Sequence, residues 1–366
     1  MATLQAPALS SRALSLGFVA LTDAAPLIVA GALGLFARHG VRVALSPAAS
    51  WAGLRDKVAF GALDAAHMLY PMPIAAALGL AGPPAALAVA AGLGRNGNTL
   101  VLSRAISGAL AEEPLPLAAA AFAALVRARA AKGLPPLRLG VVHPVSSHNY
   151  LLREWLVSGG LNPDVDLAMS VLPPPAMPVA LGTGALDGFC AGEPWGSAAV
   201  ACGAGRIMLA TGDIWPDHPE KVFAFRASVV EAEPAAAIAA TAAVIAAARW
   251  LDEPANREEA AAILAQDAIP AVAPHIIAHG LAGRVPEPDG TVRALAHPLN
   301  FRAALAPHPA HAAFWLGCMR RCGHVPAGFD QAAALAPFRH DLFARAAQAL
   351  GEPMHPPSPI PTEFAA

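Results

Sequence analysis

Two expected helix starts carry side chains that could bind a small anion. His148 follows two serines, and either Ser146 or Ser147 can cap a helix over residues 148–159. At such a start, backbone N–H groups and the helix dipole attract negative charge, and the imidazole adds a donor. Glu193, in the stretch GEPW, opens another helix directly after an apolar run. A surface histidine and a plain helix start would give the same pattern, so these residues are candidates only.

The lysines of the chain are informative because they are so few. Of 24 basic residues, only Lys57, Lys132 and Lys221 are lysines. The first belongs to a charged helix face and the second ends an Ala-rich helix, where a cation suits the dipole. Lys221 has neither explanation, and a compact point charge suits an anion. Trp51, which follows Ser50 at a third helix start, could be a core filler or a flat wall with an N–H donor.

Other motifs with chemical potential are weaker. GLGRNG at 92–97 matches a dinucleotide-binding pattern, but a strand-like run follows it instead of a helix, which indicates a glycine-rich turn. Ser147 and His148 are adjacent on a helical turn, so their side chains point apart and do not form a nucleophile and base. Cys318 and Cys322 lie one helical turn apart near two histidines, but their spacing is not usual for zinc. We therefore expect no enzyme, no metal and no cofactor.

A repeated tetrapeptide indicates how the candidate residues are positioned. GALD at 61–64 returns as GALD at 184–187, an offset of 123 residues (184 − 61). Each copy follows a helix-like run and leads into a strand-like one. We expect two similar β-α-β-α-β units, with Asp64 and Asp187 in equivalent turns.

The expected elements alternate, which predicts parallel, doubly wound sheets that bind ligands beyond the carboxyl ends of their strands. In the first unit the strands are 14–20, 41–46 and 63–69, and the helices are 24–38 and 51–60. In the second the strands are 137–142, 167–173 and 186–192. The fold class is thus α/β with two lobes. We assign 13–104 to lobe 1, 105–212 to a crossover helix and lobe 2, 213–350 to a return to lobe 1 with a helical region, and 351–366 to a Pro-rich tail.

Composition excludes several classes of protein. The formal net charge is −2 and there is no block of like charges, which argues against a nucleic-acid surface. The uncharged run 65–94 contains four prolines and does not predict a membrane span. The first residues carry one early arginine and no clear cleavage site, so we expect a cytoplasmic protein.

Several stretches together resemble a known family. They include TDAAP at 22–26, SW at 50–51, HM at 67–68, NGN at 96–98, SHNY at 147–150, GEPW at 192–195 and PEK at 219–221. In this order they resemble the nitrate- and bicarbonate-binding proteins of the NrtA/CmpA type, and most of all the NasS-type nitrate/nitrite sensors. The resemblance implies a type II periplasmic-binding-protein fold with a ligand cleft between the lobes.

The resemblance also implies a ligand site and a function. The implied contacts are Trp51, Gly97, Asn98, His148, Gly192, Glu193, Trp195 and Lys221. A NasS-type sensor would bind nitrate or nitrite in the cytoplasm and release a sequestered NasT-type RNA-binding antiterminator, which regulates nitrate assimilation. The alternatives are the substrate-binding component of a nitrate or bicarbonate ABC transporter, and an enzyme of the same fold.

Overall fold

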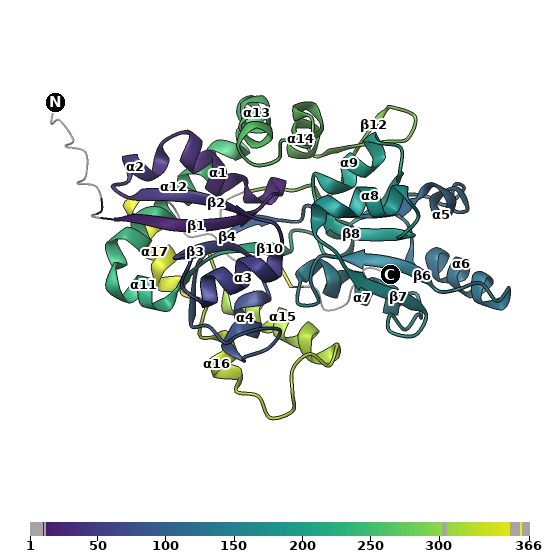
Figure 1. The fold of residues 1–366 in the computed structure, drawn as a ribbon, viewed down its shortest axis with the longest axis horizontal. Coiled ribbons are helices and arrows are strands. Elements are labelled where there is room, and N and C mark those ends of the chain that lie inside the picture. Colours follow the sequence, from purple (N-terminus) through teal and green to yellow (C-terminus); the bar gives the residue numbers. More distant parts are fainter. Residues whose placement is uncertain (1–9, 11, 302–305, 352–358, 361–366) are drawn as a thin grey trace. The chain divides into compact units, whose positions relative to one another are not determined.

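The computed structural model describes residues 10, 12–301, 306–351 and 359–360. Contacts divide the chain into two compact units. Unit 1 comprises the described residues within Met1–Gly94, Pro219–Pro270 and Phe301–Ser358. Unit 2 comprises those within Arg95–His218, Ala271–Asn300 and Pro359–Ala366. The chain is coloured along its sequence in Figure 1, which labels the elements of each unit.

Unit 1 is built on a five-stranded sheet of order β2-β1-β3-β10-β4. Its strands are β1 (Ala13–Val19), β2 (Arg42–Ala48), β3 (Ala65–Leu69), β4 (Leu87–Arg95) and β10 (Pro219–Arg226). β1 pairs in parallel with β2 and β3, and β10 pairs antiparallel with β3. Because the chain steps outward to β2 and back to β3, right-handed crossovers place their connecting helices on opposite faces of the sheet.

Helices cover both faces of this sheet (Figure 1). Those of the first half are α1 (Ala25–Ala32), α2 (Leu35–Arg38), α3 (Trp51–Ala59) and α4 (Met72–Ala77). Those that follow β10 are α11 (Ala227–Ala232), α12 (Pro234–Asp252), α13 (Arg257–Asp267), α15 (Pro309–Arg321), α16 (Gln331–Leu335) and α17 (His340–Ala349). α12 is long and apolar enough to cross a membrane by length and composition, but it packs on α1 and α17 and is mostly buried, as a core helix is.

Unit 2 repeats the sheet of unit 1 with order β7-β6-β8-β5-β9. Its strands are β5 (Asn98–Ser103), β6 (Leu137–Val141), β7 (Leu167–Val171), β8 (Gly188–Gly192) and β9 (Gly205–Ala210), with a hairpin of β11 (Arg284–Pro286) and β12 (Val292–Ala294). β6 pairs in parallel with β7 and β8, and β5 pairs antiparallel with β8 and β9. Its helices are α5 (Arg104–Gly108), α6 (Ala119–Ala131), α7 (Ser147–Ser158), α8 (Met177–Gly182), α9 (Trp195–Ala201), α10 (Thr211–Ile214) and α14 (Pro274–Leu281).

The equivalence predicted from the GALD repeat is confirmed. The carboxylate of Asp64 accepts the backbone N–H of Ser15 on β1 at 2.8 Å, and that of Asp187 accepts the backbone N–H of Arg138 on β6 at 2.8 Å. Ser15 and Arg138 are themselves 123 residues apart (138 − 15). The preceding glycines, Gly61 and Gly184, both have positive φ, which explains why glycine stands in each copy. The repeat is therefore a strand-entry turn that is built twice.

The boundaries of the units differ from those expected after residues 104 and 212. β5 pairs in the sheet of unit 2, so the chain leaves unit 1 at 94/95 and returns at 218/219. β10, which the sequence analysis did not predict, fills the matching place in unit 1. β5 and β10 thus run antiparallel to their neighbours β8 and β3, where we expected parallel strands alone.

Two expected helices are interrupted, and the tail falls outside the description. The helix predicted over 24–38 breaks between α1 and α2, where Gly34 has a φ of 66°. The crossover predicted over 105–134 consists of α5 and α6, which are separated by a segment with Pro114 and Pro116. Most of the expected Pro-rich tail lies outside the described residues.

Candidate functional site

In unit 1, Lys221 lies in a buried ion cluster at the start of β10. Its Nζ is 2.8 Å from Asp23 Oδ2 and 2.7 Å from Glu220 Oε1. Asp23 stands in the short 3₁₀ turn Thr22–Ala24, directly beyond the carboxyl end of β1. Lys221 is 1% exposed, and the two carboxylates are equally buried. The charge of the ammonium is therefore already balanced within unit 1, which the sequence analysis did not predict.

His67 and Trp51 complete this cluster. His67 lies on β3 diagonally across from Lys221, because Lys221 pairs with Leu69 in the ladder. Its Nε2 is 3.1 Å from Asp23 Oδ1, and its ring meets that of Trp51 edge-on at 5.0 Å. Trp51 begins α3, whose cap Ser50 accepts the N–H of Gly53, and its ring centroid is 5.6 Å from Lys221 Nζ. Within the described residues, the buried indole Nε1–H of Trp51 has no hydrogen-bond partner.

Burial and ion pairing act in opposite directions on this cluster. Burial favours the neutral forms of Asp23 and Lys221. The ion pair outweighs burial, so Lys221 holds the pKa of Asp23 below its ordinary value, and Asp23 holds the pKa of Lys221 above its ordinary value. Burial lowers the pKa of His67, and Asp23 only partly reverses this. With His67 neutral, two carboxylates and one ammonium leave one net negative charge, so an anion would have to bind through hydrogen-bond donors as well as through Lys221.

In unit 2, four of the predicted site residues meet where β5 and β8 pair. Asn98 lies opposite Gly192 in the ladder, and the backbone N–H of Glu193 donates to Gly97 O at 2.9 Å. Gly97 has a φ of 90° and lies in the short connection into β5, whereas most of the glycine-rich turn predicted over 92–97 is strand, because β4 continues to Arg95. Because β5 is antiparallel, its first residue lies at the carboxyl end of β8, where such sheets bind ligands.

Asn98 and Lys221 occupy equivalent places in the two units. They are 123 residues apart (221 − 98), and their ladder partners, Leu69 and Gly192, are separated by the same number (192 − 69). Asn98 is the first residue of β5 and Lys221 the third of β10, and each of these strands runs antiparallel to its ladder partner. The repeat seen in GALD therefore extends to the candidate site.

The carboxylate of Glu193 is buried and held within unit 2. It accepts Thr99 Oγ1–H at 2.7 Å and the backbone N–H of Ser197 at 3.1 Å. Burial raises its pKa, although the hydrogen bonds from Ser197 and Thr99 lower it in part. A raised pKa increases the share of the neutral carboxyl group at a given pH, and the neutral form repels an anion less than the carboxylate does. Trp195, two residues on, is buried at the first position of α9.

The helix start at His148 is confirmed. α7 begins at Ser147, and its cap Ser146 accepts the backbone N–H of Asn149 at 3.2 Å. His148 is buried, and its Nε2 lies 3.2 Å from Ser146 Oγ. It follows the carboxyl end of β6, at the same edge of the sheet as Gly192.

The structure thus gathers the predicted residues into two groups. Unit 1 holds Trp51 and Lys221, and unit 2 holds Gly97, Asn98, His148, Gly192, Glu193 and Trp195. The sequence analysis missed the partners Asp23, His67, Glu220 and Thr99. A usable signal was present for His67, a polar residue in the otherwise apolar strand-like run LDAAHML.

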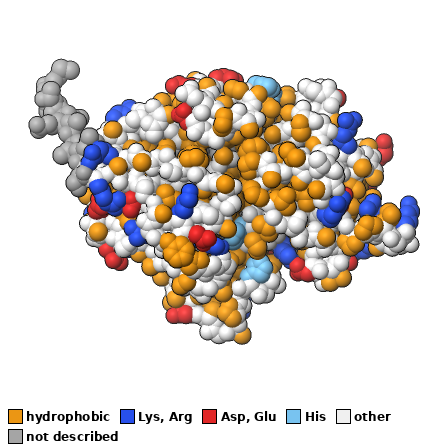
Figure 2. All heavy atoms as spheres, viewed as in Figure 1, with side chains coloured by type: hydrophobic (Ala, Val, Ile, Leu, Met, Phe, Trp, Pro, Cys, Tyr) orange, Lys and Arg blue, Asp and Glu red, His pale blue; other side chains and the backbone are white. Residues whose placement is uncertain are grey.

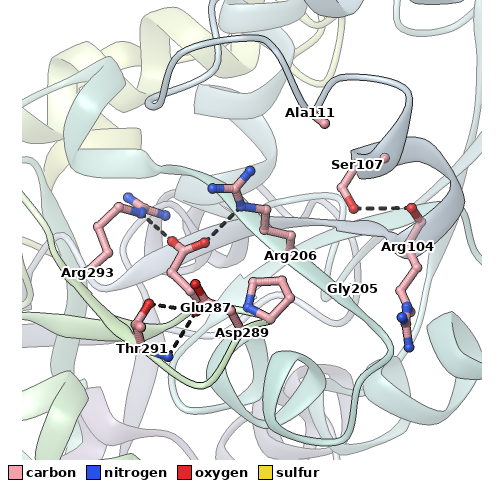
Figure 3. Close-up of a pocket in the computed structure, with 11 residues that line it drawn as sticks. Arg104, Ser107, Ala111, Gly205, Arg206, Glu287, Asp289, Thr291 and Arg293 are labelled. Atoms are coloured by element: carbon pink, nitrogen blue, oxygen red, sulfur yellow. Dashed lines mark hydrogen bonds and ion pairs between the residues drawn. The ribbon is translucent and has the colours of Figure 1, made fainter.

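A separate groove of about 540 Å³ lies on unit 2. Figure 3 shows Glu287 between two arginines, and its carboxylate is 2.8 Å from Arg206 Nε and 2.5 Å from Arg293 Nε. Glu287 thus pairs with two of the three arginines that line the groove. No cluster of three or more metal-ligating side chains occurs in the described part of the chain. On the face drawn in Figure 2, basic and acidic side chains are interspersed.

Comparisons with known proteins agree with this architecture. The model of the NMT1-like family matches residues 8–265. The nitrate/nitrite binding protein NrtA of a Nostoc species is 33% identical over 358 residues, which cover 94% of this chain and 79% of that protein. The nitrate import ATP-binding protein NrtC of Synechocystis is 40% identical over 250 residues, which cover 67% of this chain and 36% of NrtC.

Solved structures show the same fold. The crystal structure of the periplasmic nitrate-binding protein NrtA from Synechocystis superposes with a TM-score of 0.85 at 33% identity, and the match covers 94% of this chain and 90% of NrtA. The alkanesulfonate-binding protein SsuA of Xanthomonas axonopodis shares the fold alone, with a TM-score of 0.60 at 16% identity. The chain therefore belongs to the NMT1-like family, is a homologue of the NrtA nitrate/nitrite-binding proteins and has the periplasmic-binding-protein fold.

Proposed function

We propose that this chain binds nitrate or nitrite as the substrate-binding component of an anion importer. The observation that carries the proposal is the buried Nε1–H of Trp51 beside Lys221, which has no partner among the described residues, in a chain that matches NrtA over 94% of its length. A buried donor without a partner is costly unless a ligand accepts its hydrogen bond. Nitrate and nitrite have only acceptor atoms to offer, so they suit such a donor.

The preference for nitrate over bicarbonate follows from the same donors. The sequence analysis placed Trp51 and Lys221 among the contacts, and both present hydrogen to a ligand. Bicarbonate also carries a hydroxyl proton, which needs an acceptor. The carboxyl oxygens of Glu193 already accept hydrogen bonds from Thr99 and Ser197. We propose no catalytic role, in keeping with relatives that are named as binding proteins.

Calorimetry on the purified protein tests this function. We expect nitrate or nitrite to bind near micromolar affinity, about 8 kcal/mol, and bicarbonate and chloride to bind far more weakly. Trp51→Phe keeps an aromatic ring but removes the N–H, and it should weaken binding by roughly tenfold or more. Trp250→Phe, on α12, is the matched control and should leave the affinity unchanged. Absence of heat with both nitrate and nitrite would refute the proposal.

The cytoplasmic sensor is a second candidate, which the resemblance to NasS-type proteins implies. The sensor would bind a NasT-type antiterminator, whereas the binding component of an importer would bind transporter subunits. The similarity to NrtA and NrtC favours the importer. A sensor must bind its partner with different affinity in the two ligand states, and the coupling must be reciprocal. Gel filtration with the antiterminator, with and without nitrate, and fractionation of producing cells distinguish the two. A complex that nitrate dissociates, from a protein found in the cytoplasm, would favour the sensor.

A further inference from the structure

Three buried side chains of unit 2 form a short hydrogen-bonded chain that ends at Asn98. The ring Nε2 of His218 lies 2.9 Å from Thr211 Oγ1, and the amide Nδ2 of Asn98 lies 3.3 Å from the same oxygen. All three residues are at most 2% exposed. The backbone of His218 is fixed, because its carbonyl accepts the N–H of Asn96 at 3.0 Å.

The oxygen of the Asn98 amide, unlike its nitrogen, finds no hydrogen-bond partner in the part of the chain that the structure describes. Among the described residues, no donor lies within hydrogen-bond reach of Asn98 Oδ1, although this oxygen is buried. Asn98 stands opposite Gly192 at the edge of the sheet where the candidate residues of unit 2 gather. A buried polar atom of this kind is costly unless a ligand or a rotation of the amide satisfies it.

The hydroxyl of Thr211 has a single hydrogen and three acceptors within reach, so the chain has three self-consistent states. In the first, Thr211 donates to a bare His218 Nε2 and accepts from Asn98 Nδ2, so Asn98 turns its carbonyl outward. In the second, His218 Nε2–H donates to Thr211 and Thr211 donates to the Asn98 carbonyl, so Asn98 turns its NH₂ outward. In the third, Thr211 donates to the backbone carbonyl of Asn98 at 3.4 Å and accepts from both His218 Nε2–H and Asn98 Nδ2, so the side-chain carbonyl of Asn98 again turns outward.

We propose that His218 and Thr211 are positioning residues that set which end of the Asn98 amide meets the ligand. This inference rests on the proposed binding of nitrate or nitrite. It adds the Asn98 NH₂ as a hydrogen-bond donor that unit 2 offers to the anion. An acceptor-only anion is repelled by an outward carbonyl and attracted by an outward NH₂. Anion binding therefore selects the second state, and it requires a hydrogen on His218 Nε2.

NMR of protein with ¹⁵N-labelled histidine tests the relay directly, because the Nε2 shift separates a bare nitrogen from an N–H. The His218→Gln spectrum assigns the signal by its loss. We expect the His218 Nε2 signal of the natural chain to stand at the N–H position with saturating nitrate. Thr211→Val, which removes the hydroxyl, should abolish this response and weaken nitrate binding about tenfold. Thr211→Ser, which keeps the hydroxyl, should preserve both.

Each outcome decides the matter. Nitrate binding measured by calorimetry with His218 Nε2 still bare would overturn the relay and leave the proposed function standing. A Thr211→Val variant that binds nitrate as tightly as the natural chain would also overturn it. If neither nitrate nor nitrite binds, both the proposed function and the relay are wrong. Should Thr211→Val fail to fold, the response of the natural chain and of Thr211→Ser still decides.

Discussion

Replacement of Lys221 by methionine should destabilise the protein strongly at neutral pH. Methionine keeps much of the length of the side chain but removes the ammonium, which leaves Asp23 and Glu220 buried without their cation. Removal of one partner from a buried ion pair costs about 3–5 kcal/mol, because the remaining charge stays buried without its counter-charge. We expect a loss of this size in the free energy of unfolding, measured by urea denaturation at pH 7.

The loss should depend on pH with a definite sign. In the natural chain the pKa of Asp23 is lowered and that of Lys221 is raised, so their stabilisation is present between the unfolded values, about 3.9 and about 10.4. It fades as pH falls through the folded pKa of Asp23, or rises through that of Lys221. In the variant, the carboxylates take up protons as the pH falls. The difference between variant and natural chain should therefore shrink toward about pH 5.

Lys57→Met is the matched control for this prediction. Lys57 is exposed on α3, and its loss should change the free energy of unfolding by less than about 0.5 kcal/mol. Asp23→Asn combined with Lys221→Met should recover part of the stability, because one uncompensated carboxylate is removed. Equal effects of the two lysine variants, or a Lys221→Met penalty that is the same at pH 5 and pH 8, would refute the reasoning.

Three further predictions concern thermal stability, measured by melting curves. Asp64→Ala should lower the free energy of unfolding by about 1–3 kcal/mol, and Asp187→Ala should lower it less. The reason is burial, since the side chain of Asp64 is 7% exposed and that of Asp187 is 20% exposed. Equal losses would contradict this. The Glu193→Gln variant should have a higher melting temperature than the natural chain at about pH 7.5 and the same one at about pH 4.5. The reason is that the pKa of Glu193 is raised by burial, so its ionisation in the folded state costs stability at a pH above its unfolded pKa. A difference that does not depend on pH would count against a buried carboxyl group. Gly196→Ala should cost about 1–3 kcal/mol, because its Cβ would lie within 3 Å of Thr99 Oγ1 and Glu193 Oε1. The control Gly280→Ala, with nothing within 4 Å, should gain up to about 1 kcal/mol.

Local turn chemistry made much of the fold predictable. The GALD turns and the caps Ser50 and Ser146 depend on a few neighbouring residues, and each is found where the sequence placed it. The exchange of β5 and β10 was missed for a different reason. A short apolar run such as TLVLS satisfies either sheet equally well, and only the path of the whole chain decides which one it joins.

The sequence predicted individual residues of the site, but not which residues contact one another. Helix starts and strand ends pointed to Trp51 and His148, because backbone geometry alone recommends those positions. The partners Asp23 and Glu220 come from separate strand ends that meet only in the folded sheet, so no spacing in the sequence links them. The same holds for Thr211, which is 113 residues from Asn98 along the chain.

Lys221 shows how a sound inference from composition can be incomplete. A lysine in a chain rich in arginine indicated a role for a compact point charge, and its burial agrees with that. The structure adds a second reason for lysine, because an ammonium fits between two carboxylates while lying over the Trp51 ring, whereas a planar guanidinium would spread its donors in a fork. Loss of nitrate binding in a Lys221 variant would therefore not by itself identify a ligand contact, since the same change disrupts the cluster that positions Trp51. Trp51→Phe removes one donor and leaves every ion pair of the cluster in place, so it tests the ligand site more sharply than any change at the lysine.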